Sequence, residues 1–142
     1  MGDKNYCHFV FRTYKGYRAL SDRESVESLY EFIGQVCKDK GFELVECKIL
    51  RDHVHCLIGF DSNHRPDYVI RMIKGISSRR FFQKYNTNRF VYRKLWGRSY
   101  FAEKIDDKGI PNVIRYIKEQ TDIYGVDKRI TRKSDGSRNR DF

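Results

Sequence analysis

The chain has 142 residues and a formal net charge of +10, from 29 Lys and Arg against 19 Asp and Glu. Its length suits one domain, no stretch approaches the roughly 18 apolar residues of a membrane-spanning helix, and 2 prolines with 15% aromatic residues argue against collagen-like or wholly disordered chains. The composition predicts a soluble basic domain with a polyanionic partner, most simply a nucleic acid, although a basic surface that serves only solubility would look the same.

Hydrophobic spacing and turn signals predict seven elements in chain order. Alternating aromatic and β-branched residues indicate strands, whereas apolar residues three and four apart indicate helices. Ser21 and Glu24 form the capping-box pattern before the first helix, and Gly41 ends that helix. The expected elements are a strand over 6–12, a helix between 21–24 and 41, strands over 42–50 and 53–60, a helix from 66 to about 85, an irregular connection over 86–94, a strand over 95–102 and a helix over 110–124.

This β-α-β-β-α-β-α order predicts the fold class. It is the order of an α+β, ferredoxin-like or RRM-like split βαβ fold, with a four-stranded antiparallel sheet and an added C-terminal helix. Residues 126–142 are basic and nearly devoid of apolar side chains. We therefore expect one domain over 1–125, followed by a flexible tail over 126–142.

The four cysteines lack the C-x-x-C spacing of a zinc finger. Each lies among apolar or strand-like residues, and the N-terminus has no apolar signal segment. These features favour free thiols in a reducing cytoplasm over two disulfides in an exported protein. The residues concerned are Cys7, Cys37, Cys47 and Cys56.

Positive charge concentrates in residues 71–98, which hold nine Lys and Arg and no Asp or Glu. Aromatic residues are interleaved with them, and single-stranded nucleic acid binds through this combination of cations for phosphates and rings for bases. A solvated basic face and ordinary core aromatics are the alternative for each residue taken singly. The candidates are Arg71, Lys74, Arg79, Arg80 and Arg98 for phosphates, and Trp96, Phe82 and Tyr85 for stacking.

A His-Val-His motif lies in the strand expected over 53–60. Side chains alternate along a strand, so His53 and His55 project to one face, about 7 Å apart, while Val54 and Cys56 point into the core. Two imidazoles so placed can share a divalent metal ion, although two partly exposed histidines on a sheet would show the same spacing.

The last predicted helix carries a tyrosine beside its apolar stripe. Tyr116 lies off the line of Ile114 and Ile117, and Gln120 is its neighbour one turn later. The two side chains can face one target together. A tyrosine at the rim of the core would fit the helix geometry as well.

Taken in order, these motifs resemble a known family. The His-hydrophobic-His strand, the basic helix, L-W-G-R-S-Y-F over 95–101 and R-Y-I-K-E-Q over 115–120 look like the HUH-type single-tyrosine transposases of small insertion sequences (TnpA-type, the insertion-sequence 200-like group). The resemblance covers about residues 5–125. It implies that Tyr116 is the nucleophile and that His53, His55 and Gln120 hold Mg²⁺ or Mn²⁺.

The resemblance also implies a mechanism. The metal ion would polarise a phosphate of single-stranded DNA as a Lewis acid, while Tyr116 attacks to form a 5′-phosphotyrosine and releases a 3′-OH. A second transesterification can then rejoin DNA without ATP. Members of this family recognise hairpins near the element's ends and are homodimers, in which Tyr116 can serve the histidines of the other subunit.

Other functions remain open at this point. A domesticated relative would nick repetitive hairpins with the same residues but move no element. A non-catalytic RRM-like domain would bind single strands without metal and without need of Tyr116. An H-x-H metallohydrolase would need further ligands, for which His8 and His64 show no motif.

Overall fold

The computed structural model describes residues 3–16, 20, 22–85 and 94–121. Its elements confirm the predicted order, with two short 3₁₀ turns added. They are β1 (Lys4–Thr13), η1 (Tyr14–Gly16), α1 (Arg23–Lys40), β2 (Glu43–Ile49), β3 (His53–Asp61), α2 (Pro66–Lys84), β4 (Trp96–Ile105), η2 (Asp107–Gly109) and α3 (Ile110–Lys118).

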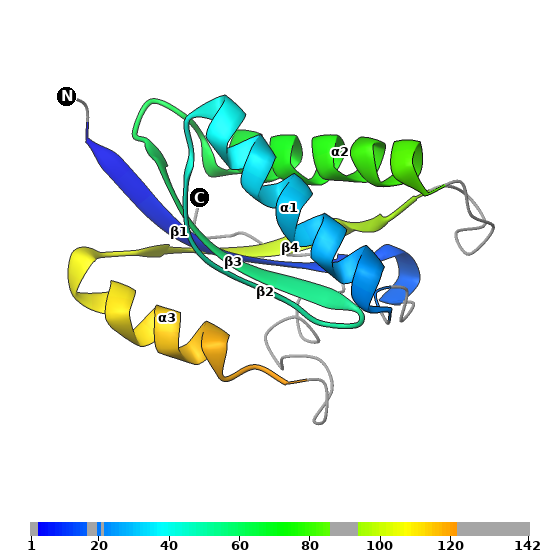
Figure 1. Ribbon diagram of the computed structural model, residues 1–142. Helices are drawn as coiled ribbons and strands as arrows, with labels where there is room; N and C mark the ends of the chain where they lie inside the picture. The colour runs from blue at the N-terminus through cyan, green and yellow to red at the C-terminus, as the bar shows by residue number, and fades with distance from the viewer. Residues whose placement is uncertain (1–2, 17–19, 21, 86–93, 122–142) are drawn as a thin grey trace.

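The strands form one antiparallel sheet in the order β2-β3-β1-β4. The two central strands, β1 and β3, are therefore not consecutive in the chain, as the split βαβ arrangement requires. Helices α1 and α2 cover one face of the sheet, and α3 lies against the other face, along β2 and β3 (Figure 1). The predicted α+β class with an added C-terminal helix is confirmed.

The main core lies between the sheet and the α1–α2 layer. Alternate residues of the two central strands, such as Phe9, Phe11 and Phe60, are fully buried there against Leu29 of α1 and Ile73 of α2. The other alternate residues of the same strands face α3. β3 is covered on both faces in this way, which explains why every residue from His53 to Phe60 is buried.

The first helix begins one residue later than the capping-box pattern predicts. Its N-cap is Asp22 rather than Ser21, and the Asp22 carboxylate accepts the Ser25 N–H at 3.0 Å. A carboxylate at this position satisfies an unpaired amide and also lies at the positive end of the helix dipole. Gly41 ends the helix as expected, with a left-handed φ of 75°.

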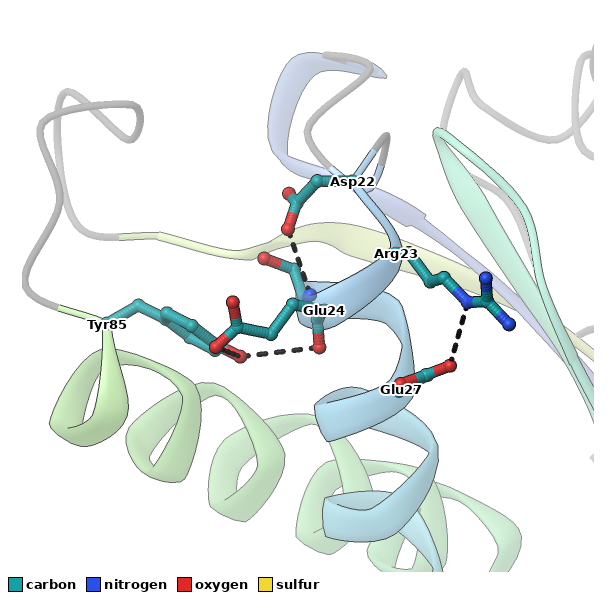
Figure 2. A network of polar contacts seen from close by, with 6 residues as sticks. Asp22, Arg23, Glu24, Glu27 and Tyr85 are labelled. Carbon is teal, nitrogen blue, oxygen red and sulfur yellow. Dashed lines mark hydrogen bonds and ion pairs between the residues drawn. The ribbon is translucent and has the colours of Figure 1, made fainter.

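A small polar network joins the start of α1 to the end of α2 (Figure 2). The Tyr85 hydroxyl donates to the Glu24 carbonyl at 3.3 Å and lies 2.7 Å from the Ser28 hydroxyl. Lys84 donates to that same Ser28 oxygen at 2.9 Å. Tyr85, considered above for base stacking, thus serves as a tether between two helices.

Two bounds differ from the sequence prediction. Strand β4 continues to Ile105 because its polar last residues pair with β1 as far as Tyr6. Helix α3 ends at Lys118 rather than 124, and the Gln120 N–H turns back to the Ile117 carbonyl at 3.2 Å. The connection over 86–93 and the tail over 126–142 lie outside the described residues.

The four cysteines are free thiols, as predicted. Burial raises the pKa of the Cys7 and Cys37 thiols to about 12, so both stay protonated near neutral pH. Within the part of the chain that the structure describes, no helix is long and apolar enough to cross a membrane.

Candidate active site

The two histidines of the His-Val-His motif lie on the face of the sheet that α3 covers. His53 and His55 are both fully buried, while Val54 and Cys56 belong to the main core. The strand alternation expected from the sequence is therefore present. Full burial also excludes the simpler alternative of two solvent-facing imidazoles, because a buried polar ring needs specific partners.

The neighbouring Asp52 orients the ring of His53. Nδ1 of His53 lies 2.8 Å from Oδ1 of Asp52, and a carboxylate there holds the ring proton on Nδ1. Nε2 is left as the lone-pair nitrogen. This Nε2 is buried and makes no hydrogen bond with any residue that the structure describes. An imidazole held in this way is prepared to bind a cation at Nε2.

A third histidine completes the cluster. Nε2 of His8, on β1, lies 3.0 Å from Nδ1 of His55, and the two rings stack with centroids 5.2 Å apart. His8 is 1% exposed. Sequence reasoning overlooked it because one histidine carries no motif. The alternation of β1, which places Cys7 and Phe9 in the core, already put His8 on the opposite face.

Tyr116 reaches this cluster from α3 of the same chain. The centroid of its ring lies 5.8 Å from that of His8 and 5.9 Å from that of His55, both edge-on. Ile117, the next residue, is fully buried and seats the helix on the sheet. Lys48 of β2 donates to the Lys118 carbonyl at 3.2 Å and so holds the end of α3.

Gln120 lies near Tyr116 but not on the tyrosine helix, which corrects the sequence prediction. The helix ends at Lys118, and Nε2 of Gln120 donates to the Tyr116 carbonyl at 3.0 Å. The amide thereby satisfies a carbonyl that the end of the helix leaves without its usual partner. Metal ligation would use the oxygen of the amide, so this hydrogen bond is compatible with the role expected for Gln120.

The donor set suits a divalent metal ion. Among the described residues, no three His, Cys, Asp or Glu are grouped in a way that could hold a metal. The predicted set has a different composition, with two imidazoles and one amide oxygen. The buried Nε2 of His53 without a hydrogen bond is the observation that fits it, since imidazole nitrogen is a common ligand of Mn²⁺ and related ions.

Comparison with known proteins identifies the family. The family described as "Transposase IS200 like" matches residues 3–120. The chain belongs to the IS200-like transposases.

Individual relatives agree with this assignment. The ISDra2 transposase TnpA of Deinococcus radiodurans is 28% identical over 105 residues, which cover 70% of this chain and 72% of that protein. A crystal structure of a Deinococcus radiodurans protein assigned as a transposase has a TM-score of 0.68 at 24% identity, covering 85% of this chain and 94% of the other. A REP-associated tyrosine transposase bound to a REP hairpin has a TM-score of 0.58 at 17% identity, covering 93% and 68%. These two structures share the fold.

In this transposase, the basic residues predicted to contact DNA fall into two groups. Arg71, Arg79 and Arg98 are exposed. Arg80 instead bonds to Gln35 at 3.0 Å and Asp39 at 3.3 Å, both on α1. An exposed guanidinium can reach a phosphate without losing a protein partner, whereas Arg80 would first have to leave its own.

Lys74 is partly buried and Trp96 is buried in the transposase. The ammonium of Lys74 donates to the Gly97 carbonyl at 2.7 Å, and burial lowers the pKa of this lysine to about 8. The Trp96 ring is 7% exposed, and its N–H donates to the Ser77 hydroxyl at 3.1 Å. These placements favour structural roles over phosphate contact for Lys74 and over base stacking for Trp96.

The basic helix and the histidine cluster lie on opposite faces of the sheet. Helix α2 packs beside α1 over the main core, whereas Tyr116 and the histidines lie beneath α3 (Figure 1). The two features are close in sequence but separated by the thickness of the sheet. A nucleic acid that touches both must therefore pass around an edge of the sheet.

Proposed function

We propose that this transposase cuts and rejoins single-stranded DNA in the cytoplasm at hairpin-marked ends of an insertion sequence, with Tyr116 as nucleophile. The observation that carries this proposal is the contact of the Tyr116 ring with two buried imidazoles, His8 and His55, within one chain. Adjacent to them, Nε2 of His53 is buried and makes no hydrogen bond with a described residue. A phenol and a cation-binding site side by side are what tyrosine attack on a phosphate requires.

The proposed reaction consists of two transesterification steps at Tyr116. Oη of Tyr116 attacks phosphorus, the bond from phosphorus to the 3′ oxygen breaks, and a 5′-phosphotyrosine remains. The phenol gives up its proton, and the departing 3′ oxygen takes one up to become a 3′-OH. In the return step, a 3′-OH attacks the phosphotyrosine, which regenerates Tyr116 and a phosphodiester.

His53, His55 and Gln120 would hold Mg²⁺ or Mn²⁺, which supplies Lewis-acid polarisation of the phosphate when bound. Asp52 keeps the proton of His53 on Nδ1, and His8 bonds to Nδ1 of His55, so both rings are fixed in orientation. These two residues are positioning groups in the proposal. They contact the imidazoles and not the DNA.

The exposed arginines of α2 and β4 are the proposed DNA surface outside the reaction centre: Arg71, Arg79 and Arg98. Their location on the far side of the sheet suits a second part of the nucleic acid, such as a hairpin, while the cut strand lies under α3. The relative bound to a REP hairpin shows that this fold accommodates hairpins in that protein. A homodimer is proposed from the family, whereas the contacts of Tyr116 with its own chain support a site completed in cis.

Covalent capture tests the proposal. The protein is incubated with Mg²⁺ or Mn²⁺ and single-stranded oligonucleotides that carry the element's ends, labelled at one end or the other, and run on a denaturing gel. A label at the 3′ end should move with the protein, whereas a label at the 5′ end should appear only in a released fragment. Chelation of the metal and substitution Tyr116→Phe should each abolish the adduct.

Tyr68→Phe, a partly buried tyrosine of α2, is the matched control and should leave the adduct unchanged. An adduct that persists in Tyr116→Phe would refute the nucleophile. Absence of any adduct from the wild-type protein on cognate ends would refute the proposed activity. Cutting without rejoining of the ends would instead favour a hairpin-nicking relative.

A further inference from the structure

Arg12 is a charged residue of the histidine face that the proposed reaction has not used. It lies on β1 directly opposite His53 of β3, as the register of the two strands shows. The alternation of β1 places it on the same face as His8 and Val10, away from the main core that holds Phe11. Cβ atoms of opposed residues are about 5 Å apart, so Arg12 begins beside the imidazole of His53.

The pairing of β1 with β4 is irregular at this position. Phe11 pairs with Tyr100 and Thr13 pairs with Trp96, so the extra residues lie on β4 and Arg12 lies opposite them. Bulges bend a strand, re-aim a side chain, and are frequent next to active sites. The irregularity lies at the end of the β1–β4 pairing that holds Arg12, and not at the end where Tyr6 pairs with Ile105.

One nitrogen of the partly buried Arg12 guanidinium lacks a hydrogen-bond partner among the described residues. Its Nε is buried and makes no hydrogen bond with any residue in the described ranges, and no ion pair joins Arg12 to a described carboxylate. Asp52, which precedes His53 in the sequence, already has other partners. Its carboxylate bonds to His53, and its backbone carbonyl accepts a hydrogen bond from the Thr13 N–H. A buried donor without an acceptor is unfavourable, and the oxygen of an anion at this position would satisfy it.

Two buried atoms of complementary character therefore belong to paired residues on neighbouring strands. Nε2 of His53 offers a lone pair and needs a cation, while Nε of Arg12 offers a proton and needs an anion. A phosphate beside a metal ion satisfies both. The planar fork of arginine also matches two oxygens of one phosphate, which lysine cannot reproduce.

We infer that Arg12 binds the non-bridging oxygens of the DNA phosphate at the reaction centre, either the one attacked or its immediate neighbour. This inference rests on the proposed function and deepens it, because it names a substrate contact outside the basic segment over 71–98. The alternative is an arginine that only packs its stem against the sheet and sends its charge to solvent. That alternative predicts no dependence on any particular phosphate.

Binding of an uncleavable complex tests the inference. All proteins carry Tyr116→Phe so that chemistry does not interfere, and fluorescence anisotropy measures the Kd of a single-stranded oligonucleotide in Mg²⁺ over a range of salt. Arg12→Gln should weaken binding about 10- to 100-fold and reduce the slope of log K against log salt by about 0.7. Arg12→Lys should keep most of the slope and lose part of the affinity.

Arg23→Gln is the matched control, since Arg23 is an exposed arginine of α1 paired with Glu27. It removes the same charge and should change Kd less than twofold. Thermal unfolding of each variant separates loss of contact from loss of fold. If Arg12→Gln unfolds, Arg12→Lys carries the test.

Neutral methylphosphonate linkages then locate the contact. Each linkage near the mapped cleavage point is replaced in turn, and the penalty of Arg12→Gln should vanish at one linkage only, at the cut or next to it. Three outcomes would overturn the inference. The increase in Kd caused by Arg12→Gln could be absent from the start, could persist at every modified linkage, or could vanish only at a linkage remote from the cut. Proteins with Tyr116 intact still report the adduct, so this failure is distinct from failure of the proposed function.

Discussion

The two faces of one sheet differ sharply in what they bury. The face under α1 and α2 presents Phe9, Cys56 and Ile58, all fully buried and apolar. The face under α3 presents His8 and His55, buried to the same degree but polar. The same strands supply both sets, so the difference is made by alternate positions only.

This difference separates stability from chemistry. Burial of apolar side chains on the first face contributes about 1.5–3 kcal/mol for each large residue. Burial of imidazoles on the second face gains little, because their polar atoms lose water and recover only some hydrogen bonds. Burial of the second face therefore has a cost in stability, which the apolar face compensates and which the proposed metal ion and phosphate would offset.

Loss of a metal-ligand candidate from the polar face should have the largest effect. His53→Leu replaces the ring by an apolar group of similar volume, and we expect adduct formation to fall at least about 10³-fold because the cation loses a ligand. Stability should fall by no more than about 1–3 kcal/mol, because the Asp52 carboxylate loses the hydrogen bond to His53 while a buried atom without a hydrogen bond is removed with the ring. Gel assays for the adduct and urea unfolding measure the two effects. A large loss of stability would mean that this face also holds the fold together.

The reciprocal change on the apolar face should behave in the opposite way. Phe9→Ala leaves a cavity in the main core and should cost about 3–5 kcal/mol of unfolding free energy, measured by urea denaturation. The folded fraction should keep its adduct-forming rate at low temperature. A variant that stays stable but loses activity would show that the two faces are coupled more closely than their packing indicates.

His8 should give an intermediate effect on metal binding. His8→Phe keeps the ring volume but removes the hydrogen bond to His55, so affinity for Mn²⁺ should fall about 10- to 100-fold, as for other residues that orient a ligand. His8→Gln, which can place an amide near the lost Nε2, should recover part of this affinity. Isothermal titration with Mn²⁺ alone measures both variants. Equal loss in the two would point to packing rather than to the hydrogen bond.

The smallest effect is expected for Lys74, on the side of the sheet away from the histidines. Burial lowers the pKa of Lys74 to about 8, against an ordinary value of 10.5. Between these two pH values the unfolded chain holds the extra proton, so the folded state gains stability as pH rises from 8 to 10.5. The wild type should gain on the order of 1 kcal/mol relative to Lys74→Met across this window in urea unfolding. If the difference in unfolding free energy between the two proteins does not change with pH, the Gly97 carbonyl keeps the lysine charged.

Several features of the fold and site could be predicted from local pattern. Apolar alternation gave the strands, Gly41 ended the first helix, and the His-x-His spacing put both imidazoles on one face. Tyr116 was separated from the apolar stripe by helix periodicity. These predictions need only neighbours within a few residues along the chain.

Other features depend on distant residues and were missed or misplaced. His8 lies 47 positions from His55 and becomes visible only when β1 pairs with β3. Gln120 was placed on a longer helix, but the chain turns after Lys118 and the amide bonds to the Tyr116 carbonyl instead. Trp96 looked available for stacking, yet its indole packs edge-on against Phe11 in the core.

The sequence by itself determined the order of elements, the family resemblance and the chemical types available to the site, because these follow from periodicity and motif. Tertiary structure decided which buried groups meet. Strand register set Arg12 opposite His53 and joined His8 to His55, and the packing of α3 on the histidine face brought Tyr116 to the cluster. These contacts join residues that are distant in the sequence, so no local sequence pattern predicts their geometry. The charge between residues 71 and 98 shows this most clearly, since the fold places α2 on the far side of the sheet from the tyrosine that follows it.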